Sequence, residues 1–353
     1  MKTIKCVYLN GKFLSPDQAS VSVFDRGFVF GEGIYEVIPV FGGRPFRLAP
    51  HLTRLESSLA AVRIHNPHNA SEWDAIFARL IKENDVQGRT SVPYRDVPMP
   101  RAQDAQERPA GGTTPGMEEV EPRPEQRSRM PGAAEVQDAR VPQAGERADT
   151  GDQSIYLQIT RGAAPRDHAF PTHTTPTVFA YAQPLNPPDP ETLASGVSAI
   201  TTPDIRWQRC DIKATALLAN VLLRQQAVDQ GVVEAILLRD GSMTEGAASN
   251  IFIVSGGRLV TPPKGPYILP GITRDLVLEL ARANQVPCAE EPVSEAHLFS
   301  AEEVWLTSST KEILPITRIN DKPVGRGKPG PVYARLRALY KDYKLAFCQG
   351  KVA

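Results

Sequence analysis

Lys213 is the first residue whose type and setting point to covalent chemistry. It follows Ile212 and precedes a run of Ala and Leu with helical spacing, in the stretch RWQRCDIKATALLANVLLRQQ. We expect this lysine to lie at a helix start and to be partly buried, and both settings disfavour the ammonium form of its amine. A neutral lysine amine is a nucleophile that forms Schiff bases. The alternative is an ordinary lysine that extends from a helix end to water.

Glu245 is the second residue of this kind. It lies in the stretch MTEGAASN, just past a hairpin turn, and Gly246 leaves room beside it. A carboxylate in this setting could pair with a heterocyclic cation such as a pyridinium nitrogen. A solvated glutamate in a surface turn would give the same pattern, so neither residue is decisive by itself.

Two segments could bind an anion. The stretch LPGITRD places Gly271, Ile272 and Thr273 at an expected helix start, where free backbone N–H groups attract phosphate. The stretch LTSSTKE places Ser308 and Ser309 at the end of a strand. Helix caps and a polar loop explain these hydroxyl groups equally well. Neither segment has the pattern of a nucleoside triphosphate loop, and no complete Gly-x-Gly-x-x-Gly motif leads from a strand into a helix.

Basic side chains at two further places could contact an acidic group. Arg54, in the stretch HLTRLE, could bind an anion or cover the polar face of its own helix. In TRGAAPRDHAFP, Arg161, Arg166 and His168 concentrate positive charge in a loop after a strand. The planar guanidinium of Arg166 suits a carboxylate, and a solvated arginine-rich turn is the alternative.

The N-terminal part of the chain is predicted to form strands and helices that position some of these residues. IKCVYLNGKFLS and GIYEVIPVFGGRPF each predict two strands, joined at Asn10-Gly11 and at Gly42-Gly43. LAPHLTRLESSLAAVRI predicts an amphipathic helix, and SEWDAIFARLIKEN predicts a second helix with Ser71 as its N-cap. The expected apolar face of the first helix consists of Leu52, Leu55, Leu59 and Val62.

Residues 88–151 differ from everything around them. This segment contains no Leu, Ile, Phe, Trp, Cys, His or Lys and is rich in Pro, Gly, Arg, Glu, Gln and Ala. Such a composition cannot bury enough apolar surface to offset the entropy of ordering, so we expect a long disordered insertion between a helix and a strand. A tolerated insertion without function and a partner-binding arm are the two interpretations of it.

The rest of the chain alternates strands and helices. VVEAILLRDGSMTEGAASNIFIVSGGRLVTPP predicts three strands with turns at Asp240-Gly241 and Gly256-Gly257, and PGITRDLVLELARANQ predicts a helix behind a glycine. The lysine stretch predicts a helix whose apolar face consists of Ala214, Leu217, Leu218, Val221, Leu222 and Val228.

This succession of elements favours an α/β (mixed α+β) fold with two domains. The smaller N-terminal α/β domain would span residues 1–184 and contain the insertion. The Pro-rich stretch NPPDPETLASG suits an interdomain linker over residues 185–196. The larger, C-terminal domain would span residues 197–353 and contain both Lys213 and Glu245.

The bulk composition excludes several classes of protein. The 353 residues carry 40 basic and 40 acidic side chains, and this balance does not indicate binding to nucleic acid or to an anionic membrane. No apolar run is long enough to span a bilayer, and the start MKTIKCVYLNGKFLS lacks the features of a secretory signal. The four cysteines form no Cys-x-x-Cys pair, so we expect no metal centre and a reduced, cytoplasmic location.

Seven blocks of the sequence occur together in an order that is similar to one enzyme family. They are DRGFVFGEGIYEV, HLTRL, IYLQITRGAAPRDHAFP, DIRWQRCDIK, EAILLRDGSMTEGAASNIF, PGITRD and TSSTKEILPI. Over about residues 5–345, outside the insertion, the chain resembles the fold-type IV pyridoxal-phosphate enzymes, most closely the bacterial D-amino acid (D-alanine) aminotransferases. The resemblance implies pyridoxal 5′-phosphate as cofactor, an amino acid and a 2-oxo acid as substrates, and a homodimer.

The resemblance also implies a role for each matching residue. Lys213 would hold the cofactor as a Schiff base and move the proton at Cα, and Glu245 would face the pyridine nitrogen. Leu269 would lie near the cofactor ring. The implied phosphate-binding residues are Arg54, Ile272, Thr273, Ser308 and Ser309.

For the substrate, the resemblance implies a carboxylate trap formed by Tyr35, Arg166 and His168. In that family the arginine and the histidine reach across from the neighbouring subunit. The chain departs from the family at Ala247 and Ala248, where many relatives carry serines that hydrogen-bond around the cofactor.

Three alternatives remain beside transamination of D-amino acids. A branched-chain L-amino acid aminotransferase and an aminodeoxychorismate lyase have the same fold, and the PRDH stretch favours the D-amino acid enzyme because it supplies a dedicated carboxylate clamp. A non-catalytic scaffold with the insertion as a binding arm is the third, and the presence of both Lys213 and Glu245 argues against it.

Overall fold

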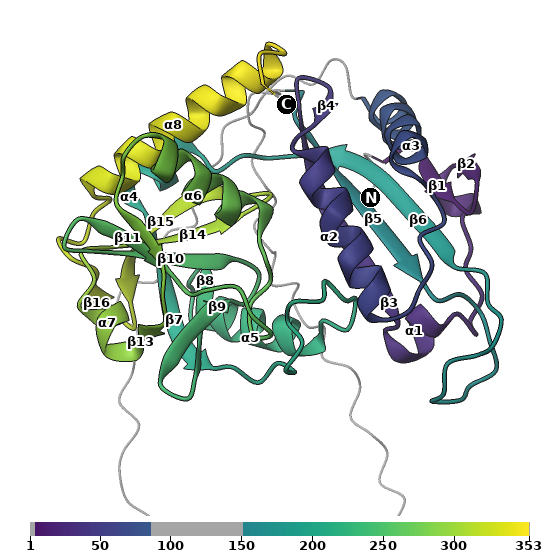
Figure 1. Cartoon of the computed structure of the whole chain (residues 1–353), viewed down its shortest axis with the longest axis horizontal. Coiled ribbons are helices and arrows are strands. Elements are labelled where there is room, and N and C mark those ends of the chain that lie inside the picture. Colours follow the sequence, from purple (N-terminus) through teal and green to yellow (C-terminus); the bar gives the residue numbers. More distant parts are fainter. Residues whose placement is uncertain (1–3, 86–150, 353) are drawn as a thin grey trace, which may run out of the picture. The chain divides into compact units, whose positions relative to one another are not determined.

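The computed structural model of the chain describes residues 4–85 and 151–352 (Figure 1). The predicted disordered insertion lies outside the described residues, apart from its last position, Gly151. Within the described ranges the expected mixed α/β architecture is confirmed, with helices packed against two sheets.

The first sheet has six strands in the order β2-β1-β6-β5-β3-β4, and all neighbouring strands are antiparallel. The predicted turn at Asn10-Gly11 is confirmed, and both residues have positive φ angles, 47° and 87°, as a two-residue hairpin turn requires. The strands are β1 (Val7–Leu9), β2 (Lys12–Leu14), β3 (Gly33–Phe41), β4 (Arg44–Pro45), β5 (Gln153–Thr160) and β6 (Thr177–Pro184).

Two helices, α2 (Leu48–Ala61) and α3 (Ala70–Glu83), pack against this sheet, and the short helix α1 (Arg26–Phe30) precedes β3. The predicted apolar face of α2 is confirmed, since Leu55 and Leu59 are fully buried and Leu52 and Val62 are partly buried against the same core. The prediction of Ser71 as the cap of α3 is wrong. Asn69 is the N-cap and forms a reciprocal capping box with Glu72, which satisfies two backbone donors.

The second sheet is larger and mixed. Its order is β12-β11-β10-β14-β15-β7-β8-β9-β13, with β16 beside β15, and the pairs β11–β12, β15–β7 and β7–β8 are parallel. The strands are β7 (Val197–Pro203), β8 (Glu234–Arg239), β9 (Ser242–Gly246), β10 (Asn250–Ser255), β11 (Arg258–Thr261), β12 (Cys288–Glu290), β13 (Val293–Ser294), β14 (Glu303–Ser308), β15 (Glu312–Ile319) and β16 (Lys322–Pro323).

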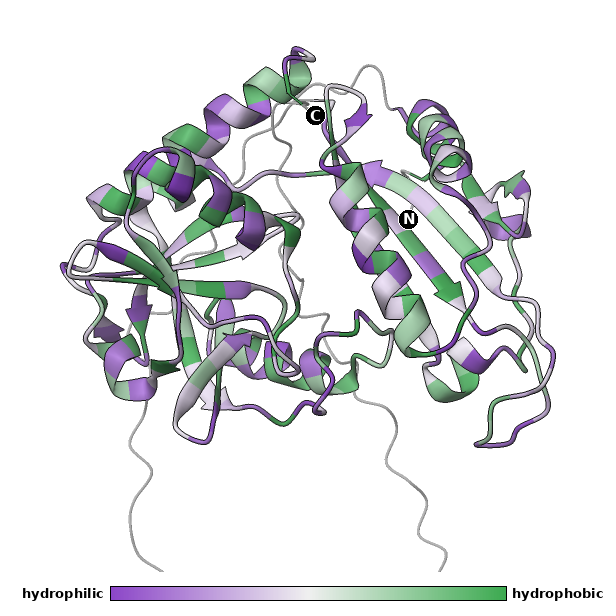
Figure 2. Ribbon diagram, viewed as in Figure 1, coloured by the Kyte–Doolittle hydropathy of each residue, from purple (hydrophilic) through white to green (hydrophobic). Residues whose placement is uncertain are grey.

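The helices of this half are α4 (Pro190–Ser195), α5 (Leu218–Asp229), α6 (Ile272–Ala283), α7 (Glu295–Phe299) and α8 (Pro331–Cys348). The side chains of α6 and α8 form one core with Phe252 and Trp305 from the sheet. Figure 2 shows apolar residues along the strands and an alternation of apolar and polar residues around α8, as expected for a helix with one buried face. The short helix α4 lies within the predicted linker.

The prediction of three strands around Glu245 is wrong. The chain forms four strands there, because the expected middle strand is broken after Gly246 and resumes at Asn250. The predicted turns at Asp240-Gly241 and Gly256-Gly257 are confirmed. The break places Glu245 near the end of β9 with the turn Ala247–Ser249 directly after it.

The predicted helix behind Lys213 also differs from the observed one. Helix α5 begins at Leu218, so Lys213 does not lie at a helix start. Its buried residues are Leu223 and Ala227, whereas Leu218 is 73% exposed and Val221, Leu222 and Val228 are also exposed. The expected apolar face is therefore turned to the surface of the chain.

The last strand of the first sheet ends at Pro184, and the first strand of the second begins at Val197. Contacts join the described residues of both sheets into one compact unit. The division into two domains therefore stays a prediction.

Candidate active site

A cavity of about 510 Å³ is bordered by residues from both sheets. This volume lies within the range of small-molecule sites. Nine predicted site residues line it together, although they are spread over most of the chain. They are Tyr35, Arg54, Lys213, Glu245, Leu269, Ile272, Thr273, Ser308 and Ser309.

Lys213 is held by strand β3 and helix α2. Its backbone carbonyl accepts a hydrogen bond from the Tyr35 N–H at 3.0 Å, and its own N–H donates to the Ser58 hydroxyl at 3.2 Å. The next residue, Ala214, forms an isolated antiparallel bridge with Ile34. The Nζ of Lys213 lies 4.1 Å from the centroid of the Tyr35 ring. The strand edge, rather than a helix end, therefore fixes where the amine points.

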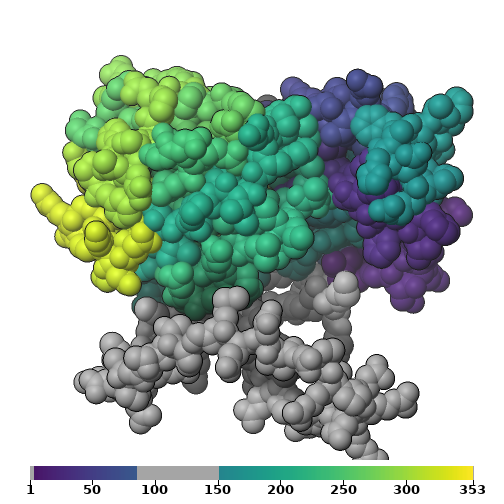
Figure 3. Space-filling view, turned by 90° about the horizontal axis from the view of Figure 1, so that it is seen from below, coloured from purple at the N-terminus to yellow at the C-terminus, as the bar shows by residue number. Residues whose placement is uncertain are grey.

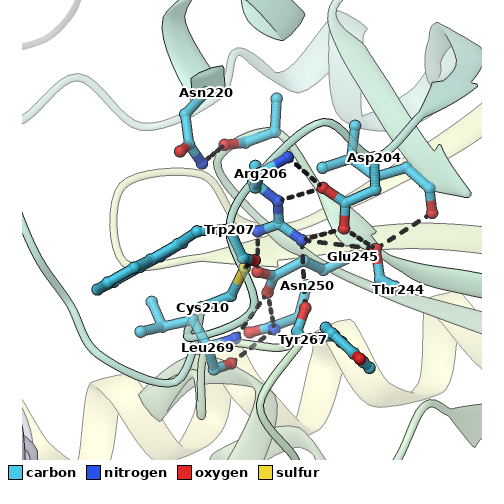
Figure 4. A network of polar contacts seen from close by, with 12 residues as sticks. Asp204, Arg206, Trp207, Cys210, Asn220, Thr244, Glu245, Asn250, Tyr267 and Leu269 are labelled. Atoms are coloured by element: carbon cyan, nitrogen blue, oxygen red, sulfur yellow. Dashed lines mark hydrogen bonds and ion pairs between the residues drawn. The ribbon is translucent and has the colours of Figure 1, made fainter. Parts of the chain in front are cut away.

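Glu245 lies at the centre of a buried polar network (Figure 4). Its Oε2 accepts hydrogen bonds from Asn250 Nδ2 at 2.9 Å and from the Leu269 N–H at 3.1 Å. Its Oε1 accepts a hydrogen bond from Arg206 Nη1. These three donors fix the plane of the carboxylate at the cavity wall.

Arg206 is shared between two carboxylates. Its Nε and Nη2 donate to the two oxygens of Asp204, both at 2.9 Å, and its Nη1 donates to Glu245. Figure 4 shows the guanidinium between these carboxylates. Burial raises the pKa of Glu245 to about 7, and the Arg206 charge, already paired with Asp204, offsets only part of this effect.

The start of α6 offers free hydrogen-bond donors to a ligand in the cavity. The N-cap is Gly271, which offers no side-chain cap, so backbone N–H groups of the first turn remain free beside Ile272 and Thr273. The Thr273 hydroxyl is therefore not the N-cap of this helix. A Cβ at position 271 would overlap the Asn250 amide, so glycine is needed for the close approach of this helix to the Glu245 network.

Hydroxyl groups from β14 and the turn after it line the same cavity. Ser308 and Ser309 are joined there by Thr307 and Thr310. The Oγ1 of Thr307 is buried and has no hydrogen-bond partner within the described residues. A buried hydroxyl without a partner is costly, so its presence at the cavity indicates a place for a polar ligand atom.

Arg54 is buried and held in place by Glu36. Its Nε and Nη2 donate to the two carboxylate oxygens at 2.8 and 2.7 Å, and its Nη1 donates to the Pro270 carbonyl at 3.0 Å, next to the start of α6. Burial alone would raise the pKa of Glu36, but Arg54 and His51 outweigh it and hold that pKa well below its usual range. Burial lowers the pKa of His51, so a neutral ring donates its Nδ1 proton to Glu36 at 2.7 Å.

Replacing Glu36 by alanine is expected to destabilise the protein by about 3–5 kcal/mol, because it leaves the Arg54 guanidinium buried without a counter-charge. The free energy of unfolding in urea measures this change. As a matched control, Glu291→Ala removes an exposed ion pair with Arg258 and should cost at most about 1 kcal/mol. Equal losses in both variants would contradict the expected role of Glu36.

The two alanines that depart from the family pattern lie at the cavity. Ala247 and Ala248 line it, and the carbonyl of Ala247 accepts a hydrogen bond from Asn220 at 2.8 Å. The hydroxyl of Ser249 donates to the buried Glu234 at 2.8 Å. The Ala247 side chain is buried in the apolar cluster with Leu223 and Ala227, whereas Ala248 is exposed.

Arg166 and His168 are not brought into this cavity. Both are exposed and lie on the loop between β5 and β6, where the Phe30 ring centroid is 5.4 Å from the Arg166 guanidinium carbon and 5.5 Å from the centroid of the His168 ring. Figure 3 shows teal residues at the surface beside the purple N-terminal residues, where this loop lies. Of the predicted trap, only Tyr35 lines the cavity of its own chain.

Sequence reasoning did not single out Glu36, Asp204, Arg206 and Asn250. One signal for Glu36 was present, because it lies between the apolar residues Ile34 and Ile38 on the same, core-facing side of β3. A carboxylate on such a face requires a buried partner. Asp204 is only two residues from Arg206, but the other carboxylate partner, Glu245, lies 39 positions away, and the sequence carries no comparable signal for that pairing.

Two other hollows, of about 630 and 640 Å³, are larger but lack this chemistry. The first is lined by residues such as Arg44, Arg47 and Asp74, and the second by Arg63, His65 and His173. Neither combines a lysine with a buried carboxylate. In the described part of the chain, no group of three or more His, Cys, Asp or Glu residues is placed to hold a metal ion, and no helix is long and apolar enough to cross a membrane.

The chain belongs to the class IV aminotransferases, because the model of that family matches residues 33–117 and 134–319. Fold-type IV is therefore its fold class, and membership of the family implies pyridoxal 5′-phosphate as cofactor.

Its curated relatives include two bacterial D-alanine aminotransferases. The enzyme of Bacillus licheniformis is 33% identical over 326 residues, which are 92% of each chain. The enzyme of Staphylococcus haemolyticus is 32% identical over 338 residues, covering 96% of this chain and 97% of the relative.

Solved structures show the same fold at lower identity. The branched-chain amino acid aminotransferase of Escherichia coli has a TM-score of 0.73 at 22% identity, covering 96% of this chain and 94% of that one. The branched-chain aminotransferase of the archaeon Thermoproteus uzoniensis, solved with norvaline, has a TM-score of 0.70 at 22% identity, covering 98% of this chain and 95% of that one.

The residues at the cavity fit pyridoxal phosphate. Uncapped amides at the start of α6 and the partnerless Thr307 hydroxyl suit the phosphate, a buried carboxylate suits the ring nitrogen, and the cavity also contains a lysine amine. The fit rests on the donors and acceptors of the chain itself.

The pKa of Glu245 gives a pH dependence of cofactor binding. Below pH 7 the carboxyl of the cofactor-free protein is increasingly protonated and can no longer pair with a pyridinium, so affinity for pyridoxal phosphate should fall by up to about tenfold per pH unit. Absorbance titrations between pH 5.5 and 8.5 measure this. In Glu245→Gln the part of the pH dependence due to this carboxyl should be absent. Identical pH profiles for the wild type and the variant would contradict the pairing of Glu245 with the pyridinium.

Proposed function

We propose that this protein transfers amino groups from a D-amino acid, such as D-alanine, to a 2-oxo acid, such as 2-oxoglutarate. The observation that carries the proposal is the shared cavity, in which Lys213, the Glu245 network and the free amides of α6 meet. The D-alanine aminotransferases among the relatives support the substrate class.

When bound, pyridoxal phosphate supplies an electron sink for the negative charge that develops at Cα of the amino acid. Lys213 would hold the cofactor through its Nζ, and the same amine would take the Cα proton of the substrate and return it. Glu245 holds a positive charge on the ring nitrogen. The start of α6, Ser308, Ser309 and Arg54 bind the phosphate, and Leu269 packs near the ring.

The carboxylate of the substrate is bound by Tyr35 of the same chain and by Arg166 and His168 of a second copy. The exposed position of the loop, outside the cavity of its own chain, supports this arrangement. Exposed apolar side chains also support a homodimer, because aromatic residues are enriched in protein interfaces. They include Phe24, Phe28, Trp207, Leu218 and Val221, and Phe28 is 78% exposed.

The test is turnover of D-alanine and of L-leucine with 2-oxoglutarate, using protein loaded with pyridoxal phosphate. We expect pyruvate from D-alanine and little or no product from L-leucine. Turnover of L-leucine but not D-alanine would assign the protein to branched-chain substrates instead, and release of 4-aminobenzoate from aminodeoxychorismate would assign it to the lyase reaction.

A further inference from the structure

A buried ion bridge lies outside the cavity and has no part in the chemistry described so far. Glu32 accepts hydrogen bonds from Arg26 Nη2 and Nε at its two oxygens and from Arg161 Nε, all at 2.7 Å. The side chains of Arg26 and Arg161 are only 2% and 6% exposed, and that of Glu32 is 20% exposed. Hydrogen bonds from Arg26, with those from Arg161, lower the pKa of Glu32. The bridge is therefore a fixed, ionised unit.

The remaining donors of the two guanidinium groups hold backbone segments far apart in sequence. Arg26 Nη1 donates to the Asp167 carbonyl at 2.6 Å. Arg161 Nη1 and Nη2 donate to the carbonyls of Arg63 and Val62, just after α2, at 3.1 and 2.6 Å. One carboxylate thus ties the loop between β5 and β6 to the end of α2.

Asp167 is the residue between Arg166 and His168. Both neighbours place their side chains against the Phe30 ring, and the Arg26 guanidinium also lies over this ring, 4.6 Å from its centroid. Fixing the Asp167 carbonyl therefore fixes the backbone from which the Arg166 and His168 side chains extend. Backbone hydrogen bonds from Arg26 N–H to the Gly162 carbonyl and from Arg161 N–H to the Glu32 carbonyl hold the base of the loop as well.

We propose that Arg26, Glu32 and Arg161 are positioning residues for the carboxylate trap. The bridge sets the loop so that Arg166 and His168 meet the α-carboxylate of a substrate in the cavity of the second subunit. The inference rests on the proposed function. It assigns to the bridge an effect on substrate binding, and none on the cofactor or on proton transfer at Lys213.

Two variants separate charge from geometry. Glu32→Gln keeps the size of the side chain but removes the charge that unites the two arginines. Arg26→Lys keeps the charge but lacks the fork that reaches both Glu32 and Asp167. Since a misplacement of about 1 Å can cost about a hundredfold, we expect KM for the amino acid and for the 2-oxo acid to rise between about tenfold and a hundredfold in both variants. Glu32→Asp should recover part of the loss.

KM, kcat and cofactor affinity together distinguish a positioning role from a merely structural one, because a general structural defect would change all three. We expect kcat to change by less than about threefold, and the absorbance and affinity of bound pyridoxal phosphate to remain those of the wild type. Glu291→Gln, in an exposed ion pair, serves as the control and should leave KM unchanged. A fall in kcat or cofactor affinity with unchanged KM overturns the inference, and if Glu32→Gln does not fold, Arg26→Lys decides.

Mixed dimers test whether the loop acts on the second subunit. When Lys213→Ala and Glu32→Gln are on the same chain and the partner is wild type, the surviving lysine faces the altered loop, so KM should rise. When the two changes are on different chains, the surviving lysine faces an intact loop, so KM should be normal. The reverse pattern shows that the loop acts within its own chain and overturns the inference.

The choice of amino donor keeps the two proposals distinguishable. The variants are assayed with whichever of D-alanine and L-leucine the wild type accepts. If the wild type accepts neither, the proposed function fails and the inference fails with it. If the wild type is active and the bridge variants keep its KM, only the inference fails.

Discussion

Lys213→Ala is expected to lower kcat by at least about 10²–10⁴-fold, because the variant loses the group that moves the Cα proton. No second lysine lines the cavity within the described residues. Borohydride reduction followed by mass measurement gives an independent readout, since it fixes a Schiff base to the chain. The wild type should gain the mass of the reduced cofactor and the variant should not.

The matched control is Lys322→Ala. Lys322 is exposed on β16, where its ammonium lies near the Phe299 ring and does not line the cavity. This variant should keep the activity and the mass change of the wild type. More than a tenth of wild-type kcat in Lys213→Ala would refute the role assigned to Lys213.

Glu245→Gln is expected to show the second largest effect, a fall in kcat of about 10²–10³-fold. The change removes a preorganised negative charge from a water-excluded site while it keeps the shape of the side chain. Steady-state assays with the accepted amino donor measure kcat. A loss of less than about threefold would contradict the role of this carboxylate.

The same variant should leave the cofactor-free protein at least as stable as the wild type at pH 8. Because folding raises the pKa of Glu245 to about 7, the carboxyl contributes most to stability below its unfolded pKa, and this contribution is lost as pH rises through 7. Glutamine removes that loss. Thermal unfolding of both proteins at pH 5 and pH 8 measures it, and a variant that is less stable only at pH 8 would contradict the expectation.

Local signals in the sequence predicted many elements correctly. The apolar spacing around Leu55 and Leu59 identified the buried face of α2, and the Asn10-Gly11 turn identified the first hairpin. These features follow from residues within one turn or one hairpin. For α5 the same local spacing predicted the wrong buried face, because burial there depends on which strands pack against the helix.

The pairing of charges could not be predicted in the same way. Arg206 and Glu245 lie far apart in the sequence, as do Arg54 and Pro270, and only folding brings them within hydrogen-bond distance. Local periodicity contains no information on such contacts. The bridge at Glu32 is a further case, since Arg26 and Arg161 are separated by more than 130 positions and the insertion.

The sequence by itself determined which residues carry chemistry: the amine of Lys213, the carboxylate of Glu245, and the glycine and hydroxyl groups near residues 271 and 308. Their types and order are properties of the chain and needed no folding to be seen. The tertiary structure decided how each is held. The backbone of Lys213 is hydrogen-bonded to β3 and to Ser58 of α2 and does not lie at a helix start, Glu245 shares one guanidinium with Asp204, and the Arg166 loop lies outside the cavity of its own chain. These outcomes depend on long-range packing, which fixes burial and partners and thereby the charge state of each group.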